Sequence, residues 1–269
     1  MKKKLFSVVI LAILVLGLSS CTLGEHLKVE YKTVDNIIEL KSFKGTSKEL
    51  QFTVPDEYEG KPVTKLGDFS IANAEYIETL TIGKNINDIS IWAISNCPKL
   101  KKINVDANNT KYMSIDGVLY TKDQKQLVSY PNMKSKTYTV LDGTEEIAND
   151  AFYKCINIEE VVLPNSIIKI SDRAFMKCAE LKKLEIPNNV KSIGADGISF
   201  CPKLESLFIP KSVETIGNYA FFGCSSLTEM KLERENSDAM TIGDGWLPVK
   251  GKSVDARIPV VYSQIREAN

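Results

Sequence analysis

The chain has 269 residues, 25% of them charged, and its 34 basic side chains balance 34 acidic ones. This balance, without a basic stripe, argues against a nucleic-acid partner, because phosphate binding requires clustered lysine and arginine. The only histidine, His26, argues against histidine-dependent catalytic triads and metal sites. The length is sufficient for one elongated core, and no Pro/Gly/Ser-rich linker divides it, so we expect one domain.

Residues 1–20 have the pattern of an export signal. Three lysines precede an apolar run from Leu5 to Leu16, and small residues lie directly before Cys21. The run is shorter than the roughly 20 apolar residues of a spanning helix, so we expect cleavage, with an uncleaved anchor as the alternative. Removal of residues 1–20 would leave 31 basic and 34 acidic side chains.

The stretch Leu18-Ser19-Ser20-Cys21 resembles the bacterial lipobox. The resemblance implies that Cys21 carries a diacylglycerol and becomes the mature N-terminus, with residues 21–27 as a tether. Buried acyl chains contribute about 0.8 kcal/mol per methylene and would hold a domain at a membrane. We therefore expect an exported protein that is lipid-anchored at the bacterial cell envelope or surface.

Residues 28–65 are expected to form a strand-rich N-terminal cap, followed by repeats over residues 66–232. Four consecutive 23-residue units have the same apolar positions; they begin at Ile147, Ile170, Ile193 and Ile216. Near the end of each unit, inward residues such as Leu184 and Ile186 alternate with polar ones, which predicts a short strand. Seven such pairs occur, at residues 80/82, 103/105, 138/140, 161/163, 184/186, 207/209 and 230/232.

A period of this size predicts a solenoid, because one unit cannot bury its own apolar face. We expect the strands to form a parallel sheet along one flank, with the rest of each coil returning along the other. Residues 233–269 are expected to cap the other end, with a last strand-like piece at residues 257–262.

An insertion of about residues 106–137 interrupts the period. The strands ending near Val105 and Val140 are 35 residues apart, and residues 112–120 read as two strands about the turn Asp116-Gly117. We expect a projecting hairpin, which is either part of a binding face or a structural excursion.

The repeated phrase Ala-Phe-x-x-Cys-x-x-Leu-x-x-Leu-x-Ile-Pro resembles the BspA-like subfamily of bacterial leucine-rich-repeat surface proteins. The resemblance implies a right-handed leucine-rich-repeat solenoid with a parallel sheet on one flank and turns or short helical segments on the other. It also implies cell-surface display and attachment to host matrix proteins or to other cells. The first and last units depart from the phrase, as capping units do.

Five cysteines share one repeat position and are expected to form a ladder inside the solenoid. They are Cys97, Cys155, Cys178, Cys201 and Cys224. Coils about 4.8 Å apart keep parallel Cβ atoms farther apart than the roughly 3.5–4.5 Å of a disulfide. We therefore predict free core thiols, with a disulfide or metal array as the alternative.

Neither a phosphate-binding glycine loop nor a Gly-x-Ser-x-Gly elbow occurs in the sequence. The acidic residues form no local motif that distinguishes paired catalytic carboxylates from solvated surface charge. We therefore expect a binding protein rather than an enzyme, with no cofactor and no metal.

Candidate binding residues follow from strand alternation. If Leu184 and Ile186 point inward, Lys183 and Glu185 face outward, and Val162 and Phe208 are apolar exceptions on the same face. A second row, one residue before the Ala-Phe pair, contains Trp92 and Tyr219. Exposed aromatic residues can anchor a protein partner, and local packing is the alternative for each.

The resemblance to the BspA-like subfamily implies adhesion to a protein ligand, either host extracellular matrix or another surface protein, as the expected function. A glycan-capture lipoprotein and a structural envelope protein with a partner in the same membrane are the alternatives.

Overall fold

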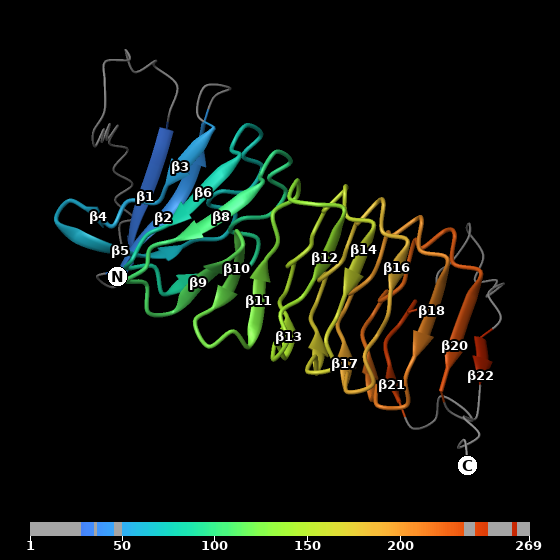
Figure 1. The fold of residues 1–269 in the computed structure, drawn as a ribbon. Helices are drawn as coiled ribbons and strands as arrows, with labels where there is room; N and C mark the ends of the chain where they lie inside the picture. Colours follow the sequence, from blue (N-terminus) through green and yellow to red (C-terminus); the bar gives the residue numbers. More distant parts are fainter. Residues whose placement is uncertain (1–27, 35–36, 46–49, 234–239, 247–259, 263–269) are drawn as a thin grey trace, which may run out of the picture. The chain divides into compact units, whose positions relative to one another are not determined.

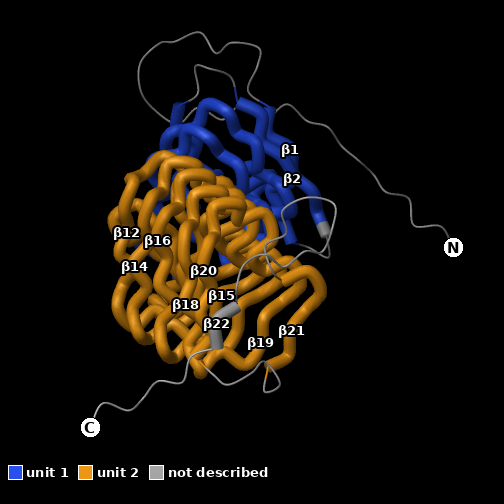
Figure 2. Tube along the Cα trace, turned by 90° about the vertical axis from the view of Figure 1, so that its right-hand side faces the viewer, with its two compact units in different colours: residues 1–111 blue, residues 112–269 orange. Residues whose placement is uncertain are grey.

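The computed structural model describes residues 28–34, 37–45, 50–233, 240–246 and 260–262. The chain divides into two compact units, residues 1–111 (unit 1) and residues 112–269 (unit 2) (Figure 2). The export signal, Cys21 and the tether lie outside the described residues, as does much of the C-terminal cap. Within the described ranges, no helix is long and apolar enough to cross a membrane.

Unit 1 begins with an antiparallel hairpin of β1 (Lys28–Val34) and β2 (Ile37–Lys44) (Figure 1). β2 pairs in parallel with β5 (Lys61–Leu66), which also pairs with β4 (Glu57–Tyr58) and β7 (Asp88–Ile89). Ile38 and Leu40 are buried while alternate residues of β2 are partly exposed, as expected for a sheet with one face on the core. The described part of residues 28–65 is therefore rich in strands.

A parallel three-stranded sheet completes unit 1. It contains β3 (Gln51–Thr53), β6 (Thr79–Ile82) and β8 (Lys102–Val105), and Leu80 lies opposite Ile103, one 23-residue repeat later. Both side chains are fully buried. The repeat period therefore sets the sheet register.

In unit 2, one side of each coil carries a short strand, and we name this side the first flank (Figure 1). It contains two parallel sheets. The first consists of β12 (Thr137–Thr139), β14 (Glu160–Val162) and β16 (Lys183–Leu184), and the second of β18 (Ser206–Ile209), β20 (Glu229–Leu232) and β22 (Val260–Tyr262). All seven strands predicted from the apolar pairs are present in the two units. From β12 to β16 and between β18 and β20, partners are 23 residues apart, as in Val161 opposite Leu184 and Leu207 opposite Met230. Between β20 and β22 they are 30 residues apart, as in Met230 opposite Val260.

The second flank of unit 2 is also a sheet, of eight strands, and Figure 2 shows it on a different side from β12, β14 and β16. It contains β9 (Tyr112–Ile115), β10 (Val118–Thr121), β11 (Gln126–Ser129), β13 (Glu146–Ile147), β15 (Lys169–Ile170), β17 (Ser192–Ile193), β19 (Thr215–Ile216) and β21 (Thr241–Ile242). In this sheet, the strands β13, β15, β17, β19 and β21 are each two residues long and pair in parallel. The described residues contain no helix, so turns and these short strands form the returning part of each coil. The predicted solenoid is confirmed.

The insertion forms the expected hairpin but does not project. Strands β9 and β10 pair antiparallel about Asp116 and Gly117, which both have positive φ (48° and 76°). β10 also pairs with β11, and β11 pairs in parallel with β13, so the hairpin extends the second-flank sheet. Val118, Leu119 and Tyr120 of β10 are fully buried. The expectation of a projection was wrong, because an apolar strand is stabilised by continuing the core.

A third row of hydrogen bonds joins the coils through the segments 150–155, 173–178, 196–201 and 219–224, which we name the third flank. In the first segment, the Asp150, Phe152 and Lys154 N–H groups donate to carbonyls of the next coil at 3.1, 2.8 and 2.9 Å. Asp150 and Lys154 have positive φ, as do Arg173 and Lys177 one repeat later. These left-handed positions turn alternate amides toward the adjacent coil and repeat every 23 residues.

Aromatic rings fill the core beneath the third flank. Phe152 stacks on Phe175 with ring centroids 4.9 Å apart and planes 17° apart, and Tyr130 stacks on the other side of Phe152 at 4.8 Å. Phe152 and Phe175 are fully buried. The Phe of the Ala-Phe pair therefore contributes to an internal stack over three successive coils, through Tyr130, Phe152 and Phe175.

Candidate functional site

The outward side chains of the first flank form a mostly polar surface with two apolar exceptions. Val162 of β14 is 48% exposed and Phe208 of β18 is 38% exposed. Between these two strands, Lys183 of β16 forms ion pairs with Glu160 at 3.3 Å and with Glu185 at 3.2 Å. The strand alternation thus places Lys183, Glu185, Val162 and Phe208 as predicted from the sequence, on the outer face.

The hydrogen-bond ladder of the first flank is interrupted between β16 and β18, which lie in separate sheets. One repeat earlier, the Lys182 and Lys183 N–H groups donate to the Glu159 carbonyl at 2.9 and 3.3 Å. The equivalent amides of Glu205 and Ser206 make no such bond to the Lys182 carbonyl in the described structure. We name this interruption the split.

A groove of about 510 Å³ lies beside the split. Its walls come from three successive coils: Leu163, Asn165, Lys182, Lys183, Leu184, Glu185, Ile186, Pro187, Asn188, Ser206 and Phe208. The groove therefore brings Phe208 together with Lys183 and Glu185, three of the predicted binding residues. Val162 is outside this lining, although it belongs to the same flank.

The charges around the groove are paired with one another. Glu159 accepts hydrogen bonds from the ammonium groups of Lys136 at 2.8 Å and Lys182 at 2.7 Å, on the coils before and after it. These two lysines lower the pKa of the Glu159 carboxyl from 4.5 to about 2. Lys182 and Lys183, which both line the groove, thus already have carboxylate partners.

Tyr219 lies on the third flank, at a left-handed position with φ of 57°. Its ring is 48% exposed and lies over Gly245, where an added Cβ would approach the ring within 2.5 Å. The ring of Phe222 is 5.9 Å from Tyr219 and 5.3 Å from Phe200, edge-on to both. Tyr219 therefore belongs to an aromatic cluster whose members lie on two coils and share no pattern in the sequence.

Trp92 belongs to unit 1, again at a left-handed position (φ 62°). Its ring is half-buried and stacks on Phe69, with centroids 4.9 Å apart and planes 25° apart. Phe69 is the more exposed of the two rings, at 54%. Trp92 thus packs against the neighbouring coil and also supports an exposed ring.

The BspA type leucine rich repeat region matches the chain in six copies, over residues 25–123 and 145–246. These ranges cover most of the chain; among the described strands, β11, β12 and β22 lie outside them. The chain belongs to the BspA-type leucine-rich repeat family. No curated protein matches it.

Solved structures are similar to this chain in fold. A leucine-rich repeat protein from Eubacterium ventriosum is 25% identical with a TM-score of 0.59, over 72% of this chain and 54% of that one. The chain thus spans about half (54%) of the length of that relative. The pneumococcal vaccine antigen PcpA is 17% identical with a TM-score of 0.50, over 82% of this chain and 84% of that one, and shows the shared fold.

The cysteine position of these BspA-type repeats is buried, and all five described cysteines are free. Each thiol can donate to a carbonyl of the preceding coil, as Cys178 does to Phe152 at 3.1 Å and Cys201 to Phe175 at 3.2 Å. Burial raises the pKa of the Cys97 thiol to about 12 and also raises that of Cys155 and Cys178. Thiolate chemistry is therefore suppressed in the folded protein. Within the described ranges, no group of three or more His, Cys, Asp or Glu residues could hold a metal ion.

We predict that the native protein reacts negligibly with a thiol reagent at neutral pH. Unfolding in denaturant without reductant would expose all five core thiols, because no bond between them needs to be broken. A colorimetric thiol titration before and after denaturation measures both states. Far fewer than five free groups after unfolding would contradict free core thiols.

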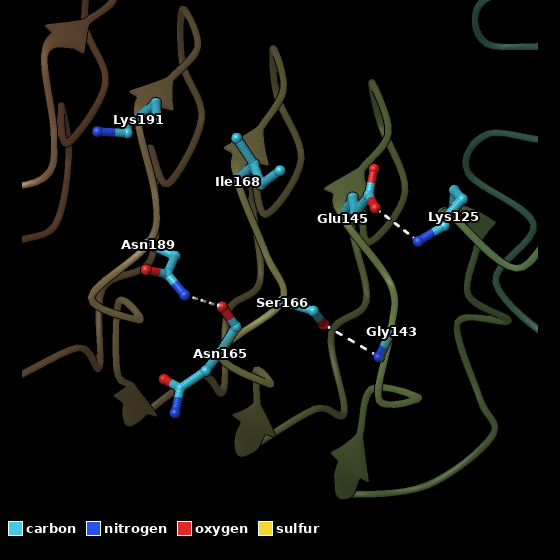
Figure 3. Close-up of a pocket in the computed structure, with 8 residues that line it drawn as sticks. All are labelled: Lys125, Gly143, Glu145, Asn165, Ser166, Ile168, Asn189 and Lys191. Carbon is cyan, nitrogen blue, oxygen red and sulfur yellow. Dashed lines mark hydrogen bonds and ion pairs between the residues drawn. The ribbon is translucent and has the colours of Figure 1, made fainter.

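A second hollow, of about 400 Å³, lies where the chain turns from the first to the second flank of the BspA-type coils (Figure 3). Its polar groups bond to one another: Gly143 N–H donates to Ser166 at 3.1 Å, and the Asn189 side chain to the Asn165 carbonyl at 2.7 Å. Lys125 pairs with Glu145 at 2.6 Å. These bonds hold successive turns together and leave the groove beside the split as the better candidate site.

Proposed function

We propose that this BspA-type protein is a cell-surface adhesin that is anchored by a lipid on Cys21 and binds a protein ligand through the first flank of unit 2. The ligand is a host extracellular matrix protein or another surface protein. The observation that carries the proposal is the partly exposed Phe208 side chain in a groove that Lys183 and Glu185 also line. An aromatic anchor with a polar rim is the usual arrangement of a binding hot spot.

The lipid anchor rests on the sequence before Cys21 and on the resemblance to the lipobox. The thiol titration described above also tests it. A thioether at Cys21 leaves five free thiols in the denatured protein, whereas an unmodified Cys21 raises the count to six.

We expect Phe208→Lys to lower the affinity of the protein for its ligand at least about tenfold, because the substitution removes a buried apolar contact at the interface. Binding of the purified protein to immobilised host matrix proteins measures the effect. Phe200→Lys is the matched control, since Phe200 is also 38% exposed but lies on the third flank. Equal binding by wild type and Phe208→Lys would contradict a first-flank site.

A glycan is the second candidate ligand, and the cluster of Tyr219, Phe200 and Phe222 favours it. Exposed aromatic rings on a rigid backing offer apolar faces on which a sugar ring can stack. A glycan array on the same sample tests this function, with Phe200→Lys as the variant expected to lose binding. Binding to neither a matrix protein nor a glycan would favour a partner in the same envelope.

A further inference from the structure

The split is confined to the first flank. On the third flank, Arg173 N–H donates to Ala195 at 2.9 Å and Lys177 N–H to Ser199 at 2.9 Å, so the two coils concerned remain joined. On the second flank, β17 and β19 pair in parallel, and Gly217 N–H donates to Ile193 at 2.8 Å. The two coils are thus joined by hydrogen bonds on the second and third flanks, and they lack such a ladder on the first flank.

The two edges of the split carry main-chain groups of the kind that pair elsewhere along the flank. On the C-terminal side of the split, the Glu205 carbonyl accepts a hydrogen bond from the Thr228 N–H at 2.9 Å, so the ladder resumes at the next coil. On the N-terminal side of the split, the Lys182 N–H donates to the Glu159 carbonyl. The Lys182 carbonyl accepts no hydrogen bond from the N–H groups of Glu205 and Ser206, which are the equivalent residues one coil later. Such unpaired strand edges are templates for an added strand.

We propose that an extended peptide segment of the protein ligand binds along the split, hydrogen-bonded to the edges of β16 and β18 and packed on Phe208. The inference rests on the proposed function and names the form in which the ligand is recognised. An extended backbone presents N–H and C=O groups at the spacing that strand edges require. β18 has four residues, so the paired segment is about four residues long.

The charges of the groove favour an uncharged backbone as the occupant. Lys183 is paired with Glu160 and Glu185, and Lys182 with Glu159 at 2.7 Å. An ionic ligand would have to displace these partners, whereas main-chain groups bind to the edges without disturbing them. The groove volume of about 510 Å³ also lies within the usual range of ligand sites, roughly 300–1,000 Å³.

Selection of random ten-residue peptides on the immobilised full chain tests the inference. Selected peptides are expected to lose affinity at least about tenfold for Phe208→Lys and to bind Ile156→Lys normally, because Ile156 is an exposed apolar residue (46%) that lies outside the groove. N-methylation of alternate peptide residues is expected to abolish binding by removing main-chain donors. Hydrogen exchange is expected to slow at Glu205 and Ser206 when the peptide is bound.

Peptides whose binding is indifferent to N-methylation, or which leave exchange at Glu205 and Ser206 unchanged, would overturn the inference, as would recovery of no Phe208-dependent peptide. A folded ligand that depends on Phe208 without protecting these amides would overturn it too, yet would leave the proposed function standing. The proposed function fails separately, if neither wild type nor variants bind any protein ligand.

Discussion

Replacing Phe175 by alanine is expected to lower the free energy of unfolding by about 3–5 kcal/mol. The Phe175 side chain is fully buried, and its ring stacks on Phe152 at 4.9 Å. The coils on either side are fixed by hydrogen bonds to their neighbours, such as Phe175 N–H to Gly197 at 2.8 Å. The backbone therefore cannot collapse into the space that the ring leaves, and the cost of the cavity adds to the lost burial.

Equilibrium unfolding in urea, extrapolated linearly to water, measures this effect. Phe208→Ala is the matched control, because Phe208 is partly exposed on the first flank and its removal is expected to change stability by less than about 1 kcal/mol. A Phe175→Ala protein with stability close to that of the control would mean that the core accommodates the loss by repacking.

Gly217→Ala is expected to destabilise the protein by about 1–3 kcal/mol or more, through overpacking. An added Cβ at this position would lie 2.3 Å from the Ala195 nitrogen and 2.5 Å from the Gly194 carbonyl carbon, which are main-chain atoms of the preceding coil. The Gly217 N–H bond to Ile193 at 2.8 Å prevents the two coils from moving apart. The glycine is thus required by the close approach of two backbones.

Gly143→Ala separates this crowding from conformational strain. Gly143 has a left-handed φ of 85°, but nothing lies within 4 Å of an added Cβ. Its replacement is expected to cost about 1 kcal/mol, from the left-handed conformation alone. Thermal unfolding of both variants provides the comparison, and a larger loss for Gly143→Ala would argue against backbone crowding at Gly217.

The first-flank strands were predictable because each predicted one is marked by two apolar positions spaced two residues apart, within the strand or just beyond its end, as Leu184 and Ile186 are at β16. In β14, β18 and β20, apolar and outward residues alternate, as in Leu207 and Ile209 about Phe208, and this period identifies a strand in the sequence. The hairpin was predictable from Asp116-Gly117, which takes the two left-handed positions of a tight turn.

The second and third flanks were not predictable in this way. Strands such as Lys169–Ile170 have two residues and one inward side chain, which is too short for an alternating pattern. On the third flank, the inter-coil bonds depend on left-handed residues such as Arg173 and Lys177, whose side chains give no signal of that conformation. The hairpin looked like a projection because its link to the second flank runs through the parallel pairing of β11 with β13, which joins residues 20 positions apart, as in Leu127 and Ile147.

For the site, the sequence identified outward residues but not their grouping. Strand alternation predicts that Lys183, Glu185 and Phe208 face outward, because each depends only on its immediate neighbours. The groove depends on the interruption between β16 and β18, and the coils concerned have the same apolar pattern as those that pair. The aromatic cluster at Tyr219 likewise combines residues from different coils.

The bonds that join successive coils also determine how unit 2 would respond to tension. They run from each coil to the next, so a pull along the stack acts on the junctions in series and each junction carries the whole load. Most junctions have three rows of bonds, whereas the junction at the split has only the second- and third-flank rows among the described residues. Mechanical load along the stack would therefore open the solenoid first at the split, beside Phe208.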